Sequence, residues 1–269
     1  MKQRINLAKM PWQGQLFAFL QGSIGKAFVE GDAFLKSQLD RTLWYDGETE
    51  TYVGSNHSIV TRADSRAREL SSGAIRVVTL QDTDNSTFKD MIYGKYYADV
   101  PEAIIQTPDG DFANQVVKIV SKKDITLNLP CKVTGLDVKI GENGSPQYSA
   151  RDDFALTQHD SLKYSNGKER FNKLENGFPV FDDNGKYTWY LRSDNSVGVS
   201  RGSGFGVNGG VANFGDSGRV GRVVLTAAEG SAPKIFEDFV NRLQSDFESQ
   251  KKDAESRYTE ARKLLLGKE

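Results

Sequence analysis

The sequence predicts an α+β protein, with a β-rich core between an N-terminal helical region and a long C-terminal helix. Three patterns support this prediction. Apolar residues before residue 45 recur at spacings of three and four, which is typical of helices. Between residues 125 and 140 they alternate with polar residues, as in a half-buried strand. From residue 236 to 265 their spacing is close to a heptad. The expected divisions are therefore residues 1–72, 73–230 and 231–269.

The N-terminal region contains two expected helices. The first is weakened by glycines, and its apolar face consists of Phe17, Leu20, Ile24 and Phe28. Asp32 is a suitable N-cap for the second helix, because its carboxylate can accept a hydrogen bond from a free amide of the first turn. The second helix has on one face Phe34, Leu35, Leu39 and Leu43.

The core is expected to open with a strand over residues 75–80 and a helix after Ser86, which can act as its N-cap. The apolar stripe of this helix consists of Phe88, Met91, Ile92 and Tyr96. The strongest strand signal follows within residues 115–140, where the alternation runs through Ile125, Leu127, Leu129, Cys131 and Val133. Beyond Gly135 the apolar phase shifts by one residue, which predicts a β-bulge. Bulges bend strands, so a small bent OB-like barrel fits this core.

Turn residues divide the rest of the core into short strands. The turn at 142–146 ends the bulged strand, and Asn176-Gly177 predicts a tight hairpin. Tyr187, Trp189 and Leu191 alternate as another strand, and residues 220–226 form the last. The following helix, residues 233–266, would be roughly 50 Å long at 1.5 Å per residue. We expect its first half, from Phe236 to Phe247, to pack on the body and its second half to project.

The composition limits the classes of partner. The chain has 35 basic and 36 acidic residues, so its overall charge attracts neither nucleic acid nor a membrane surface. Cys131 is the single cysteine, which excludes an intramolecular disulfide and fits a reducing compartment. The apolar run at residues 16–20 is too short for a signal-peptide core, and no stretch has the length of a membrane span. We expect a cytoplasmic protein, in the host cytoplasm if it is viral.

The most informative segment for function is residues 186–222, which combines aromatic, arginine and glycine residues. Nine of the 24 residues from Gly198 to Gly221 are glycine, which permits close approach of the backbone to a ligand. Aromatic rings stack on bases and arginines pair with phosphates. The candidate nucleic-acid-binding residues are Tyr187, Trp189, Tyr190, Arg192, Arg201, Phe205, Phe214, Arg219 and Arg222.

Each of these features has a structural alternative. The glycine-rich segment can be a surface or assembly loop, and Trp189 can belong to the core. Four further arginines, in and after residues 59–70, extend a basic path or, alternatively, lie on a solvated helix face paired with Asp64 and Glu69. These four are Arg62, Arg66, Arg68 and Arg76.

No pattern in the chain indicates an enzyme, a cofactor or a metal. The aspartate pairs at 109–111, 152–153 and 182–183 lie in turn contexts, where aspartate is common for backbone reasons. The segment Gly202–Gly206 lacks the lysine and the strand-to-helix context of a phosphate loop. Cys131 lies in an alternating strand and is expected to be a small buried hydrophobe rather than a nucleophile.

In its layout the chain resembles phage-type single-stranded DNA-binding proteins. The resemblance rests on the character of residues 186–222 and on the helical tail, and it includes no family motif. It implies a β-rich binding core without catalytic residues and a terminal extension that contacts partners. The chain differs from the common pattern at residues 262–269, which do not form an acidic tail, so recruitment through such a tail is not expected.

Three functional hypotheses follow, and the third, which has the least support, is an enzyme whose site matches no known motif. In the first, the protein binds single-stranded nucleic acid by base stacking and phosphate neutralisation. The segment between Lys251 and Leu266 then mediates self-association or contacts a protein partner. In the second, it is a structural protein of a virion or another oligomer. The glycine-rich loop and the long helix are then subunit contacts.

Overall fold

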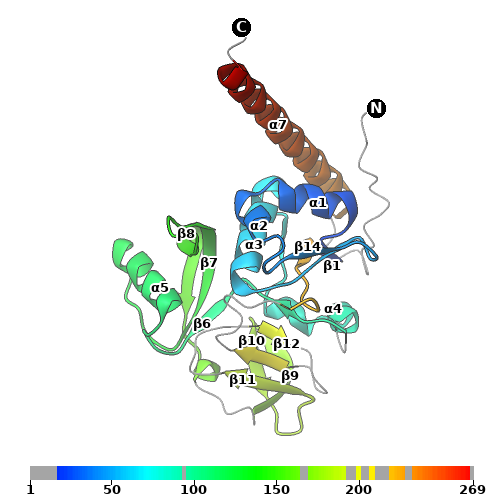
Figure 1. Ribbon diagram of the computed structural model, residues 1–269. Coiled ribbons are helices and arrows are strands. Elements are labelled where there is room, and N and C mark those ends of the chain that lie inside the picture. Colours follow the sequence, from blue (N-terminus) through cyan, green and yellow to red (C-terminus); the bar gives the residue numbers. More distant parts are fainter. Residues whose placement is uncertain are drawn as a thin grey trace.

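The computed structural model describes residues 17–92, 95–163, 169–191, 198–200, 206–209, 218–227 and 232–266. Helices and small sheets form a body from which the C-terminal helix α7 projects (Figure 1). One hydrophobic cluster includes residues from all three expected divisions, among them Phe17, Phe88, Val133, Trp189 and Phe239. The expected divisions therefore share a core.

The N-terminal region is partly helical, as predicted, but it also contributes strands. Its elements are β1 (Phe17–Phe19), α1 (Gly22–Glu30), α2 (Ala33–Ser37), β2 (Trp44–Asp46) and β3 (Thr51–Val53). The Asp32 carboxylate caps α2 by accepting a hydrogen bond from Leu35 N, as predicted. The helix expected to include Phe17 begins only at Gly22, because Phe17 lies in β1. This strand pairs with β14 (Val224–Ala227), which also pairs with β4 (Ile75–Val77).

Helix α3 (His57–Ser71) lies at the centre of the body, between β4, β7 and α7. The Asn56 side chain caps it by accepting a hydrogen bond from Ile59 N. Ala63 and Ala67 are buried, so neighbouring elements approach α3 closely. Short helices follow at η2 (Gln81–Asp84) and α4 (Ser86–Ile92). The cap of α4 is Asn85 rather than Ser86, because the Asn85 side chain accepts a hydrogen bond from Thr87 N at 2.8 Å.

A three-stranded sheet has the order β6–β7–β8, with bounds Ala103–Ile105, Cys131–Ile140 and Pro146–Thr157. The register shifts at the predicted position, because Thr134 lies opposite Ala155 but Leu136 lies opposite Ala150. The extra residues lie in β8, opposite Gly135, and not in the strand that contains Gly135 as predicted. The prediction of a strand from Ile125 is wrong. Residues before Cys131 follow α5 (Asp111–Lys122), and Ile125 N closes that helix by donating to Val120 O. Strand-like alternation there reflects a helix end and a connecting segment.

A six-stranded sheet has the order β10–β9–β11–β13–β12–β5. Its strands are β5 (Ala98–Asp99), β9 (Glu169–Glu175), β10 (Phe178–Phe181), β11 (Tyr187–Leu191), β12 (Gly198–Ser200) and β13 (Gly206–Gly209). The predicted hairpin turn at Asn176-Gly177 joins β9 to β10, and both residues have positive φ. Strands β11 and β13 run parallel. The described strands form open sheets, and they include no closed barrel.

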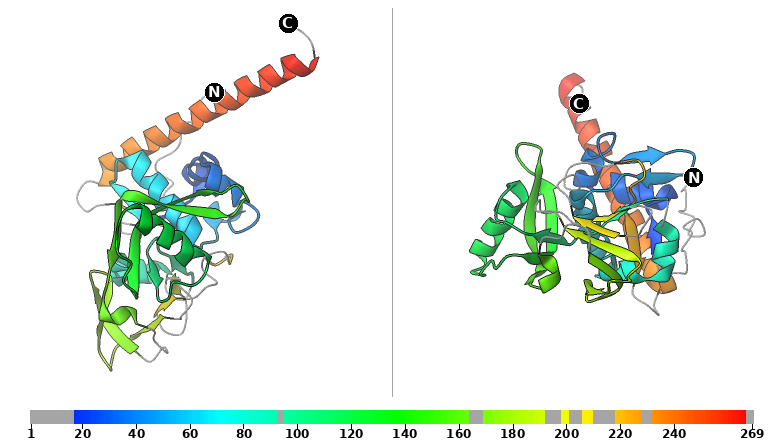
Figure 2. Two further views of the ribbon diagram at one scale, coloured as in Figure 1. Left: turned by 90° about the vertical axis from the view of Figure 1, so that its left-hand side faces the viewer. Right: turned by 90° about the horizontal axis from the view of Figure 1, so that it is seen from below.

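Helix α7 (Ala232–Leu266) confirms the long C-terminal helix. Phe239, Val240 and Leu243 are buried, and this part of the helix packs against α1 and α3. All side chains of residues 251–264 are exposed, and Figure 2 shows this end standing clear of the body. We call residues 251–264 the outer arm. None of the helices described has the length and apolar character needed to cross a bilayer.

Candidate functional site

The structure describes five of the nine residues of the predicted site, and it places them in two different parts of the fold. The other four, Arg192, Arg201, Phe205 and Phe214, lie outside the described residues. Tyr187, Trp189 and Tyr190 lie in β11, inside the six-stranded sheet. The remaining two lie in the loop that precedes β14.

Trp189 belongs to the core. Its side chain is 0% exposed, and its indole nitrogen donates a hydrogen bond to Ser161 O at 2.9 Å. The Phe171 ring meets it edge to face, with centroids 6.2 Å apart. A base cannot stack on this ring without opening the fold, so the structure corrects the assignment of Trp189 to a binding surface. Tyr187 and Tyr190 are half-buried in the same strand.

Arg222 is also internal, with 6% of its surface exposed. Its guanidinium lies 4.2 Å from the centroid of the Tyr96 ring and donates hydrogen bonds to the carbonyls of Arg219 and Gly221. Burial lowers the pKa of this guanidinium. Arg222 therefore shapes the loop beside it and is not available to a phosphate.

Arg219 is the one described member of the predicted set that is exposed. Its guanidinium carbon lies 5.5 Å from the centroid of the Trp44 ring, within range of a cation–π contact. Among the residues that the structure describes, no carboxylate forms an ion pair with Arg219. Trp44 lies half-buried in β2, opposite Val53. Trp44 is not among the predicted site residues, although its position before the Asp46-Gly47 turn is a usable signal for an exposed hairpin.

The loop that carries Arg219 is held by backbone contacts. Gly218 N donates to the Tyr97 hydroxyl at 2.7 Å, and Arg222 N donates to Tyr97 O at 2.9 Å. Gly54 N donates to Gly221 O at 2.9 Å. A Cβ atom on Gly221 would lie 2.7 Å from Ser55 N, so only glycine fits there. The loop is thus fixed at both ends, and Arg219 has a defined position over Trp44.

The opposite face of the β2–β3 hairpin carries two tyrosines. Tyr45 and Tyr52 are cross-strand neighbours with ring centroids 5.2 Å apart, and Tyr45 is 48% exposed. They line a hollow of about 220 Å³ with Lys26, Glu30, Leu39 and Asp40. Side chains alternate between the two faces of a strand, so this hollow does not share a face with Trp44.

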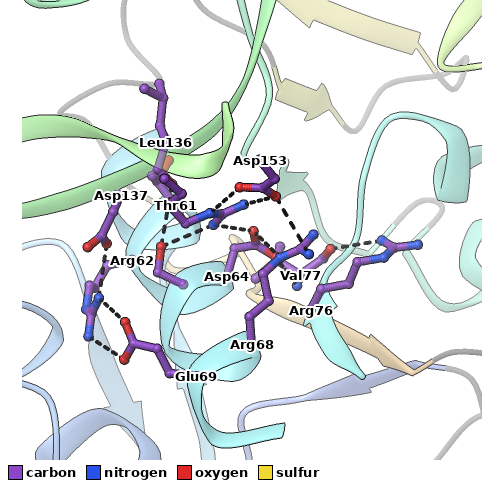
Figure 3. A network of polar contacts seen from close by, with 12 residues as sticks. Thr61, Arg62, Asp64, Arg68, Glu69, Arg76, Val77, Leu136, Asp137 and Asp153 are labelled. Atoms are coloured by element: carbon purple, nitrogen blue, oxygen red, sulfur yellow. Dashed lines mark hydrogen bonds and ion pairs between the residues drawn. The ribbon is translucent and has the colours of Figure 1, made fainter. Parts of the chain in front are cut away.

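The arginines on and after α3 are internal rather than part of a basic path. Arg62 pairs with Asp32 at 2.8 Å, Asp137 at 3.0 Å and Glu69 at 3.1 Å. Arg68 and Arg151 both pair with Asp64, which is 1% exposed. Figure 3 shows Arg68 beside the Asp64 carboxylate. The expected pairing with Asp64 and Glu69 is confirmed, but the face is largely buried rather than solvated. Charge neutralisation by carboxylates leaves this group little attraction for phosphate.

Three buried titratable groups have strongly shifted pKa values: His57, Asp99 and Glu102. Burial lowers the pKa of His57 to about 4, and its Nδ1 lies 3.0 Å from the Tyr148 hydroxyl. Burial raises the pKa of Asp99 and of Glu102 to about 7. All three have at most 5% of their surface exposed, so a substrate cannot reach them. Over the described ranges no cluster of three or more potential metal ligands occurs.

Comparison with known proteins finds no matching family model, no similar curated protein and no similar solved structure.

Proposed function

We propose that the chain is a non-enzymatic single-stranded nucleic-acid-binding protein, with Trp44 and Arg219 in its interface. The observation that supports this is the exposed guanidinium of Arg219 over the Trp44 ring, without a carboxylate partner among the described residues. A guanidinium held this way can pair with a phosphate while its neighbouring ring offers a face to a base. The backbone contacts of Gly218 and Gly221 hold this geometry before any ligand arrives.

Within this proposal the interface comprises the Trp44 ring and the loop that carries Arg219. The site is therefore centred on the β2–β3 hairpin and this loop, rather than on β11. The protein acts in the cytoplasm, where a reducing environment suits its buried thiol at Cys131.

The test is fluorescence anisotropy with a labelled oligothymidylate at several salt concentrations. Trp44→Ala should weaken binding by about 1–3 kcal/mol, the usual worth of a base–aromatic stack. Arg219→Gln should weaken binding and reduce its salt dependence, because fewer counterions are released. Arg170→Gln is the matched control, since Arg170 is an exposed arginine on β9. If all four proteins bind alike, or none binds at physiological salt, the proposal is wrong.

A second candidate function, subunit of an oligomer, is supported by the outer arm of α7. Residues 251–264 are all exposed, with Tyr258 at 70% and Leu264 at 82%. A solvent-surrounded helical segment of this length is marginally stable by itself, so a contact that covers it would stabilise it. Light scattering of the full chain over a range of concentrations tests this candidate directly.

A further inference from the structure

A groove of about 580 Å³ lies between α5 and the start of β8, in the lobe at the left of Figure 1. Its helix side is formed by one face of α5, with Gln115, Lys118, Ile119 and Lys122. Its strand side is formed by the β7–β8 turn and the first residues of β8, up to Tyr148. The Trp44–Arg219 pair contributes nothing to this groove, so it is a separate feature of the molecule.

The strand beside the groove is a sheet edge. Strand β8 is the last in the order β6–β7–β8, so one side of it faces no described strand. The side-chain amide of Gln115 lies against this edge: its nitrogen donates to Pro146 O at 3.3 Å, and its oxygen accepts from Tyr148 N at 2.8 Å. One residue of a parallel neighbouring strand would make the same two bonds. Gln115 thus takes the place of a peptide unit at this edge.

The charges along the groove favour an acidic occupant. Lys118 and Lys122 are exposed, one helical turn apart, and neither forms an ion pair with any residue the structure describes. Glu142 is the single carboxylate among the lining residues. Between the charged rims, Ile119 and Pro146 offer apolar contact. The Tyr148 ring, at 8% exposure, is not open for stacking on a base. A nucleic acid would use the lysines and leave the strand edge unused.

We propose that this groove binds an extended, acidic segment of a partner protein, which adds as a strand beside β8. Its backbone takes over the hydrogen bonds of the Gln115 amide, and its carboxylates meet Lys118 and Lys122. Main-chain hydrogen bonds then supply affinity, as in other cases of strand addition. The two lysines and the apolar contacts of Ile119 and Pro146 select the sequence of the partner segment. The proposal is independent of nucleic-acid binding.

Anisotropy of a fluorescein-labelled nonapeptide with alternating glutamate and valine tests the proposal on the full chain. The peptide should bind, and the double substitution Lys118→Glu with Lys122→Glu should weaken binding at least about tenfold, since it replaces attraction by repulsion. Lys123→Glu is the matched control: this lysine is exposed directly after α5 but does not line the groove. Gln115→Ala should strengthen binding, because the edge is then open.

Three results would overturn the proposal. The peptide fails to bind at millimolar concentration, or a backbone N-methylated version binds equally well, which would indicate charge attraction without strand addition. The third result is that oligothymidylate displaces the peptide and that oligothymidylate no longer binds the Lys118/Lys122 double variant. This result would make the groove a nucleic-acid site. Trp44→Ala should leave peptide affinity unchanged, so failure here is distinguishable from failure of the proposed function. Circular dichroism establishes that each variant is folded.

Discussion

Arg151 on β8 donates a hydrogen bond to the carboxylate of Asp64 on α3 across 2.8 Å, although the two residues are 87 positions apart. The same carboxylate accepts hydrogen bonds from Arg68 Nε and from Val77 N, each at 2.9 Å. Asp64 therefore joins a helix, the β6–β7–β8 sheet and strand β4 at one buried point. It is a structural centre of the body and not a site for an external ligand.

Replacing Asp64 should be costly. Asp64→Asn keeps the shape but removes the charge that two guanidinium groups share in a buried place. We expect unfolding free energy to fall by about 3–5 kcal/mol, the usual effect of removing one partner of a buried ion pair. Urea denaturation followed by circular dichroism measures it. Asp160→Asn is the control: its pair with Lys163 is exposed, so its effect should stay below about 1 kcal/mol. Equal effects of the two substitutions would contradict the central role of Asp64.

Gly135 allows β7 to approach β8 closely at the point where the register between the two strands shifts. It has φ +68, and a Cβ atom there would lie 2.5 Å from the backbone of Asp153 and Phe154. Gly135→Ala should therefore cost about 2–4 kcal/mol, from backbone strain and the forced shift of the β8 bulge. Gly144→Ala separates the two causes, because Gly144 has φ +79 but open space around its Cα. We expect about 1 kcal/mol for Gly144→Ala in the same denaturation measurement. A cost for Gly135→Ala no larger than that would show that the close contact is unimportant.

Asp99 should make stability depend on pH. Burial raises its pKa to about 7, and the Ser55 hydroxyl opposes the shift without forming a well-aligned hydrogen bond. The unfolded value is about 3.9. Between these values the folded state holds more protons, so the stability that this group contributes is complete below about pH 4. It is lost as pH rises towards 7.

Asp99→Asn removes this titration. The unfolding free energy of the variant minus that of the parent should rise by about 2–3 kcal/mol from pH 5 to pH 8. His57 and Glu102 also titrate, but they are common to both proteins and cancel in the difference. A pH-independent difference for Asp99→Asn would show that its carboxyl titrates normally.

The sequence predicted those elements whose signals are local. Asp32 as a cap, the Asn176-Gly177 turn and the two-part α7 helix each depend on a few neighbouring residues, and the structure confirms them. The irregularity at Gly135 is confirmed in position, but its extra residues lie in β8. The failure at β1 involves a longer-range contact, whereas the failures at Ile125 and Ser86 arise from ambiguous local signals. β1 was read as helix because its identity depends on pairing with β14, more than two hundred positions away in the chain.

The candidate site illustrates the same limit. A segment rich in aromatic and arginine residues has the same composition whether these side chains face a ligand or one another. Trp189 and Arg222 lie in the interior of the body. The Trp189 indole nitrogen donates a hydrogen bond to Ser161 O there, and the Arg222 guanidinium lies over the Tyr96 ring. Trp44 lies far from Arg219 in sequence, and only the folding of the loop against Tyr97 brings them together. Spacing within the segment 186–222 could not reveal that pair.

The outer arm of α7 separates the two candidate functions. A chain that ends after Gln250 loses residues whose described side chains are all exposed, so its melting temperature should stay within about 2 °C of the parent. Phe239, Val240, Leu243 and the Arg66–Asp246 ion pair remain to hold the inner half of α7 on the body.

If the protein is a subunit of an oligomer, light scattering should show assemblies for the full chain and monomers for the shortened one. If it binds nucleic acid, the shortened chain should retain most affinity for oligothymidylate and lose cooperativity along the strand. Tyr258→Ser in the full chain is the matched variant, since it removes the largest exposed ring of the arm while keeping its length. A shortened chain that cannot fold would contradict the assignment of residues 251–264 as an appendage.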